Sequence, residues 1–327
     1  MKLKILIPAA LILVILAISQ LIANNDEAVK NGNEPAQPAE RKYKTIAIVV
    51  HDMRHMFMAS VAGMIREKAR ENENIRILLY DSESSNDKQT AQLNELIGKK
   101  VDGIILNPTD KAAVNPAVEK VKKACIPLIT VNMNTTSNAV DCYIGSDSIR
   151  VGELQGTYVA EELKGVGNLV VLAGKAGHDA TEDRLEGLRN IIGKYPGMHI
   201  VRVEYGNWDR SKGAEIMENI LQGEARIDAV ISQNDEMLLG AVQMLERYHL
   251  KPVTIGVDGI PEALEAMMEG RIGATVYQNN KAQAAAAFEI MSRLFNNEKV
   301  EKVKWIPMEL VTPETIDNYI ISDRMKP

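Results

Sequence analysis

Short apolar runs alternate with longer amphipathic runs from residue 43 onward, and this alternation limits the fold more than any other feature. Five apolar runs in the first part of the chain are typical of buried strands: TIAIVV (45–50), IRILLY (75–80), DGIILN (102–107), PLITV (127–131) and DCYIG (141–145). Between them, apolar residues recur at helical spacing over 57–72, 87–100 and 111–124. Strands that are apolar on both faces and separated by helices predict a parallel sheet built of βαβ units.

The same pattern then starts again. Strands are predicted over 168–173, 199–205, 228–233 and 253–257, and helices over 149–164, 180–194, 210–222, 235–248 and 261–269. A chain of 327 residues exceeds what one hydrophobic core usually organises. We therefore expect an α/β protein with two doubly wound parallel sheets. A further strand over 273–278 leads into a helix over 279–295, and periodicity alone leaves open which sheet this strand joins.

The amino-terminal segment predicts export. Lys2 and Lys4 precede an apolar run over 5–22, which is the pattern of a signal sequence. The run is also close to the length that spans a bilayer, so a cleaved signal and a retained membrane anchor both remain open. It contains no cysteine, which excludes a lipid-modified amino terminus. Residues 23–42 are polar and predict a flexible linker, so the folded part is expected to lie outside the cytoplasm.

Charge and cysteine content exclude several classes of function. The net charge of −6 argues against a nucleic-acid partner. Cys125 and Cys142 have no histidine or cysteine neighbours at metal-ligand spacing, so we expect no metal site, and no cofactor is predicted. Both cysteines flank apolar runs, which favours two buried thiols over a disulfide, although pairing remains open.

The residues that follow the predicted strands are the candidate ligand site. In open parallel sheets, ligands bind beyond the carboxyl ends of the strands. These segments are rich in amides, carboxylates and aromatic residues and lack a glycine-rich phosphate loop: 51–58, 107–110, 132–134, 176–184, 208–209, 234–236, Asp258 and 278–280.

Six strings of residues resemble a known family. They occur in the same order as in type I periplasmic sugar-binding proteins, and most resemble the ribose-binding branch, the substrate-binding components of ABC transporters: NPTD (107–110), WDRSKG (208–213), SQNDEMLLGA (232–241), GVDG (256–259), ATVYQ (274–278) and ELVTPETID (309–317). The resemblance runs from Tyr43 to the end of the chain. It implies two lobes joined by three crossing segments, with the strand that ends at Gln278 closing the second sheet. The implied amino-terminal lobe is 43–146 plus 279–309, and the implied carboxy-terminal lobe is 147–278 plus 310–327.

The resemblance also implies a set of ligand-binding residues. Phe57 and Trp208 match the aromatic positions that pack on the two faces of a sugar ring, whose C–H groups are weakly apolar. The positions that hydrogen-bond the hydroxyls are matched by Asn107, Arg184, Asn234, Asp258 and Gln278.

The chain departs from the ribose pattern at four further positions of the site. Asn132 and Met133 stand where that branch has an aspartate and an arginine, His55 replaces an asparagine, and Met58 replaces a second aromatic residue. Loss of a charged pair that binds hydroxyls changes selectivity among sugars. We therefore expect a monosaccharide or related polyol, with ribose as only one candidate.

Some of these residues have other interpretations. Arg184 is also placed to pair with Asp183 or Glu186 on a solvated helix face. Asp258 is also a candidate helix cap. For the adjacent pair we assign Asn234 to the ligand and Asp235 to capping the helix that follows.

The predicted function is capture of the sugar and its presentation to the membrane permease of an ABC transporter. The alternative is a tethered sensor that signals to a histidine kinase. A glycosidase would need two opposed carboxylates, here Asp258 with Asp209 or Asp110, and no nucleophile motif accompanies the histidines, so no catalytic residue is predicted. A repressor with the same sensing fold is disfavoured, because an export segment stands where its DNA-binding headpiece would be.

Overall fold

The computed structural model describes residues 43–223 and 226–319. The predicted export segment (1–22), the linker (23–42) and the end of the implied second lobe (320–327) lie outside these ranges. Within the described ranges, no helix combines the length and the apolar character needed to cross a bilayer.

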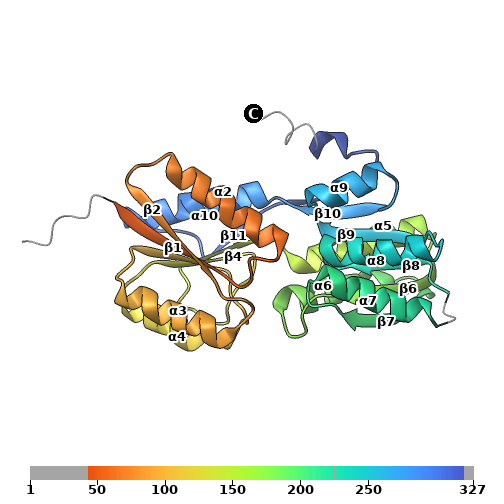
Figure 1. Ribbon diagram of the computed structural model, residues 1–327, viewed down its shortest axis with the longest axis horizontal. Helices are drawn as coiled ribbons and strands as arrows, with labels where there is room; N and C mark the ends of the chain where they lie inside the picture. The colour runs from red at the N-terminus through yellow and green to blue at the C-terminus, as the bar shows by residue number, and fades with distance from the viewer. Residues whose placement is uncertain (1–42, 224–225, 320–327) are drawn as a thin grey trace, which may run out of the picture. The chain divides into compact units, whose positions relative to one another are not determined.

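The first sheet has six parallel strands in the order β11-β5-β4-β3-β1-β2. The strands are β1 (Lys44–Val50), β2 (Ile75–Asp81), β3 (Gly103–Leu106), β4 (Leu128–Val131), β5 (Cys142–Gly145) and β11 (Val303–Trp305). Helices α2 (Met56–Arg70) and α10 (Asn280–Phe295) cover one face, and α3 (Asn86–Gly98) and α4 (Asn115–Lys123) cover the other (Figure 1). Because both faces are covered, β1 and β3 are buried along almost their whole length.

The second sheet repeats this plan in the order β12-β10-β9-β8-β6-β7. Its strands are β6 (Val166–Ala173), β7 (Gly197–Tyr205), β8 (Ala229–Ser232), β9 (Val253–Asp258), β10 (Ala274–Gln278) and β12 (Met308–Val311). All pairs are parallel except β10 with β12. Helices α5 (Ser148–Glu162) and α6 (Asp179–Ile192) contribute to the core on one face, and α7 (Arg210–Leu221), α8 (Asp235–Arg247) and α9 (Pro261–Met268) to the core on the other.

Polar side chains cap the first turn of several helices, close to the positions where the sequence predicts that these helices begin. Asp147 accepts a hydrogen bond from the Arg150 N–H at the start of α5, and Asp209 accepts one from Lys212 at the start of α7. Such caps satisfy N–H groups that have no partner within the helix.

Within the described residues the chain passes between the two sheets three times. The passages follow β5, follow β10 and join β11 to β12. The strand predicted over 273–278 is β10, which pairs with β9, and the next helix, α10, returns to the first sheet. The predicted class, α/β with two doubly wound sheets, is confirmed, whereas the limits of the two lobes stay a prediction.

Two strands were not predicted from the pattern of apolar residues. In β11 all three residues are exposed, and Trp305 is 56% exposed with its ring edge-on to Tyr143. The alternating burial of β12 is only four residues long. Backbone pairing with β5 and β10 forms these strands, and apolar periodicity does not detect strands of this kind.

The expectation of two buried thiols is correct for Cys142 and wrong for Cys125. Cys142 is fully buried in the core between the first sheet and helices α2 and α10. Cys125 lies in the turn after α4 with a φ of 56° and is exposed. Both thiols are free, so the structure contains no Cys125–Cys142 disulfide.

Candidate functional site

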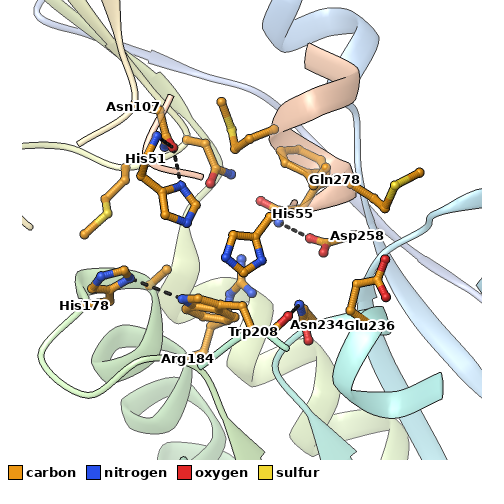
Figure 2. Close-up of a pocket in the computed structure, with 16 residues that line it drawn as sticks. His51, His55, Asn107, His178, Arg184, Trp208, Asn234, Glu236, Asp258 and Gln278 are labelled. Carbon is orange, nitrogen blue, oxygen red and sulfur yellow. Dashed lines mark hydrogen bonds between the residues drawn. The ribbon is translucent and has the colours of Figure 1, made fainter. Parts of the chain in front are cut away.

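One cavity brings together all eleven residues that the sequence assigned to ligand binding (Figure 2). The segments around the first sheet contribute the "first wall": His51, His55, Met56, Phe57, Met58, Asn107, Asn132 and Met133. The segments around the second sheet contribute the "second wall": His178, Ala180, Arg184, Trp208, Asn234, Glu236, Asp258 and Gln278. Five of these residues were not in the predicted set: His51, Met56, His178, Ala180 and Glu236.

The lining residues follow the carboxyl ends of the strands, as the strand-end rule predicts. His51 follows β1, Asn107 follows β3, and Asp258 and Gln278 end β9 and β10. Phe57 and Met58 lie in the first turn of α2. The crevice beyond the strand ends of both sheets is therefore one site, as expected for open α/β sheets.

Asn107, which follows β3, orients the ring of His51, which follows β1. The Asn107 Nδ2 donates to the Val131 carbonyl at 3.1 Å, so the amide oxygen faces the other way. That oxygen lies 2.6 Å from His51 Nδ1 and also accepts from the His51 backbone N–H. An amide oxygen cannot donate, so Nδ1 of His51 carries the proton.

The rings of three histidines lie close together in the cavity lining. His51 and His55 belong to the first wall, and His178 belongs to the second. His51 and His55 stack with centroids 4.8 Å apart, and His178 is edge-on to His51 at 6.3 Å. Burial and the neighbouring His55 lower the pKa of His51 to about 3, and burial and Lys175 lower the pKa of His178 to about 4. Burial also lowers the pKa of His55. At neutral pH the cavity therefore contains neutral imidazoles.

His178 has a partner at each ring nitrogen, and one of the two contacts joins the second wall to the segment after β3. Its Nε2 lies 3.0 Å from the carbonyl oxygen of Thr109, which follows β3, and its Nδ1 accepts from the Trp208 indole N–H at 3.2 Å. The two partners fix one neutral tautomer, with the proton on Nε2. An ion pair of 2.6 Å between Lys111 and Asp179 spans the same two segments.

Arg184 lies inside the cavity wall, so its interpretation as a surface ion pair is wrong. The residue is 4% exposed, its guanidinium donates to the Gln233 carbonyl, and its carbon Cζ lies 5.6 Å from the centre of the Trp208 ring. Its Nε is buried without a hydrogen-bond partner among the described residues. Burial lowers the pKa of Arg184, and the nearby Asp258 opposes this effect.

Asp258 presents a buried carboxylate to the cavity. It is 9% exposed, and its Oδ1 accepts from Gln278 Nε2 at 2.8 Å. Burial raises the pKa of Asp258 to about 7, while Arg184 acts in the opposite direction. Its φ of 116° is one that residues other than glycine rarely adopt, and such backbone strain is concentrated at functional sites. Asp258 does not cap the next helix, because the residue before α9 is Ile260.

The capping role predicted for Asp235 is wrong, whereas the assignment of Asn234 to the ligand stays a prediction. Asn234 is the cap of α8: its Oδ1 accepts from the Met237 N–H at 3.0 Å, and its Nδ2 donates to the Trp208 carbonyl. Asp235 is fully buried and accepts from the N–H groups of Gly259 and Ile260 and from the Thr275 hydroxyl. Asp235 therefore supports the backbone beside Asp258, while Asn234 both caps α8 and lines the cavity.

Trp208 lies against the backbone that follows β6. A Cβ atom added to Gly174 would lie 2.1 Å from the indole ring, so only glycine allows this approach. Across the cavity, Phe57 is 7% exposed in the first turn of α2. Apart from the histidines, each wall thus supplies one aromatic ring.

Neither partner carboxylate needed for a glycosidase lies in the cavity. Asp209 caps α7, and Asp110 accepts from the N–H groups of Ala112 and Ala113. The second carboxylate of the lining is Glu236, which pairs with Arg210 at 2.6 Å. In the part of the chain that the structure describes, no three histidine, cysteine or acidic side chains form a group that could hold a metal ion.

Comparisons with known proteins agree with this architecture. A family profile described as a periplasmic binding protein domain matches residues 46–299. The ribose import binding protein of Bacillus subtilis is 29% identical over 279 residues, which cover 85% of this chain and 90% of that protein. A solute-binding protein of Bacillus halodurans with bound myo-inositol is 34% identical with a TM-score of 0.82, covering 86% of this chain and 98% of that one. A solute-binding protein of Actinobacillus succinogenes with bound D-allose is 29% identical with a TM-score of 0.79, covering 84% and 100%.

Proposed function

Because the chain belongs to the family of periplasmic binding protein domains, we propose that it binds a monosaccharide or related polyol and presents it to an ABC-type permease. The ligand would lie between two lobes, 43–146 with 279–309 and 147–278 with 310–327. Binding would shift an equilibrium between open and closed forms toward the closed form, which the permease recognises.

The observation that carries this proposal is the composition of the cavity. Phe57 and Trp208 offer apolar ring faces, and the Arg184 guanidinium and the Asp258 carboxyl group lie among amides and imidazoles. Aromatic faces suit the C–H faces of a sugar, and fixed donors and acceptors suit its hydroxyls. We assign the ligand contacts to His55, Phe57, Met58, Asn107, Asn132, Met133, Arg184, Trp208, Asn234, Asp258 and Gln278.

An extracytoplasmic location is part of the proposal. The family to which the chain belongs and the import proteins that it resembles support this location. The apolar run over 5–22 would direct export and, if retained, would anchor the protein at the outer face of the membrane.

The test is calorimetry of the full chain, purified in detergent, against D-ribose, D-allose, L-arabinose, myo-inositol and xylitol. We expect saturable binding of at least one of these ligands with one site per chain. Absence of binding to all five would overturn the proposal. Co-purification with a histidine kinase instead of permease subunits would replace its transport part with sensing.

A further inference from the structure

His51 has a nitrogen that the protein leaves without a partner. Its Nδ1 is bonded to Asn107, and its Nε2 is buried without a hydrogen-bond partner among the described residues. Because Nδ1 carries the proton, the unpartnered Nε2 is a bare acceptor. A buried acceptor without a hydrogen bond is costly, so native structures rarely retain one without a reason.

The neighbouring rings cannot satisfy this acceptor. The His55 ring stacks on His51 with an angle of 13° between the planes, so the in-plane lone pair of Nε2 does not point at it. The His178 ring is edge-on, but its Nε2 faces the Thr109 carbonyl and its Nδ1 accepts from Trp208. Figure 2 shows the His51 ring between Asn107, His55 and His178, with its bonded nitrogen toward Asn107.

We propose that His51 is a specificity-determining residue whose Nε2 accepts a hydrogen bond from one hydroxyl of the bound sugar or polyol. This inference rests on the proposed function, and it adds a residue that the matched sugar-binding positions do not include. Burial keeps the pKa of His51 near 3, so the ring stays a neutral acceptor throughout the neutral range.

The proposal restricts the ligand. The group opposite His51 must be a donor, so a hydroxyl fits, whereas a deoxy position, a methyl ether or a carboxylate does not. A site that leaves a buried polar group unpaired discriminates strongly against an analogue that lacks the matching hydroxyl. His51 would therefore select a fully hydroxylated ligand over its deoxy analogue at one ring position.

The test uses two substitutions that each place an amide group near the position of one of the two imidazole nitrogens. In His51→Asn, the side-chain amide replaces Nδ1, retains the bond to Asn107 and removes the Nε2 acceptor. In His51→Gln, the amide oxygen reaches the Nε2 position and the bond to Asn107 is lost. His199→Asn, the same substitution at an exposed histidine of β7, is the matched control.

The full-length proteins are titrated by calorimetry with the tightest ligand of the five-sugar panel and with each of its monodeoxy derivatives. We expect His51→Asn to weaken binding of the parent ligand about 5- to 10-fold, the usual value of one neutral hydrogen bond. For one monodeoxy derivative, the substitution should cause no further loss, because the bond is already absent. His51→Gln should bind the parent ligand more tightly than His51→Asn, and His199→Asn should match the wild type.

Each other outcome is decisive. Unchanged affinity in His51→Asn overturns the inference and leaves the proposed function intact. An equal loss for the parent ligand and every derivative, or failure of both His51 variants to fold, assigns His51 to structure and also overturns it. If the wild type binds none of the five ligands, the proposed function fails and the inference fails with it.

Discussion

The two walls of the cavity differ in charge although they occupy equivalent places in two similar sheets. The second wall contains Arg184, Glu236 and Asp258. The first wall is lined by imidazole, amide, thioether and phenyl groups, and its nearby ion pair, Asp52 with Arg54, lies outside the cavity lining. Ionised groups make the stronger hydrogen bonds. We infer that the second wall provides most of the affinity, while the first wall selects among ligands by shape and by neutral donors and acceptors.

The largest expected effect comes from removing the carboxylate of the second wall. In Asp258→Ala, the ligand loses a buried carboxyl group as a hydrogen-bond partner and Arg184 loses its nearby acidic neighbour, so affinity should fall about 100-fold or more. Calorimetry with the tightest panel ligand measures this loss. Asp209→Ala, the same change at the cap of α7, should lower the melting temperature and leave affinity unchanged. Near-normal affinity in Asp258→Ala would contradict the inferred role of the second wall.

Trp208→Ala should have the next largest effect. The change removes one ring face and the indole N–H that fixes the tautomer of His178. Loss of an aromatic contact of about 2 kcal/mol corresponds to roughly 30-fold weaker binding. Trp305→Ala removes the same side chain from an exposed position outside the cavity and should leave affinity unchanged. Equal behaviour of the two variants in a titration would exclude Trp208 as a ligand contact.

His178→Gln tests the buried contact of His178 with the segment after β3, through the pH dependence of stability. Burial lowers the pKa of His178 from 6.5 to about 4, so its contribution to stability is complete above pH 6.5 and is lost as pH falls toward 4. Glutamine retains a donor for the Thr109 carbonyl but does not titrate. The difference in unfolding free energy, wild type minus variant, should therefore decrease on acidification by at most about 1.4 kcal/mol per pH unit.

Urea unfolding at several pH values between 7.5 and 4 measures this difference. The other groups that titrate in the cavity, His51, His55 and Asp258, are present in both proteins and cancel to first order. If this difference in unfolding free energy does not change with pH, the folded protein does not hold His178 as a buried neutral ring.

The smallest effect is expected when charge is introduced into the first wall. Asn132→Asp combined with Met133→Arg restores the pair found in the ribose-binding branch. The gain from charged hydrogen bonds is offset by burial of the new charges, because Met133 is 6% exposed. We expect the affinity ratio of D-ribose to myo-inositol to rise about fivefold, or about 1 kcal/mol. An unchanged ratio in parallel titrations would show that the neutral first wall does not set selectivity.

The sequence predicted the position of the site better than the role of each residue in it. Apolar periodicity locates the carboxyl ends of the strands. The segments that follow those ends already included His51, His178 and Glu236. The narrower set of ligand-binding residues omitted these three, because it contained only the positions compared with the ribose pattern. Burial keeps His51 and His178 neutral, and their tautomers are fixed by contacts with Asn107, Thr109 and Trp208, which are distant in the chain.

Other errors have local physical causes. Asn234 and Asp235 are both good helix-capping residues, so composition could not separate them. The extended backbone of Asn234 makes it the cap, and the buried position of Asp235 turns its carboxylate toward Gly259 and Ile260. Cys125 follows an apolar-patterned helix, but the turn at its φ of 56° leaves the side chain exposed.

The positions of the two tryptophans give the protein a built-in optical signal. The chain has only Trp208 and Trp305, one bonded to an imidazole in the cavity and the other exposed on β11. Indole emission depends on its surroundings, so the two residues would contribute separable components. A Trp305→Phe protein would retain one emitter, and its spectrum would follow occupancy of the cavity in real time without an added dye.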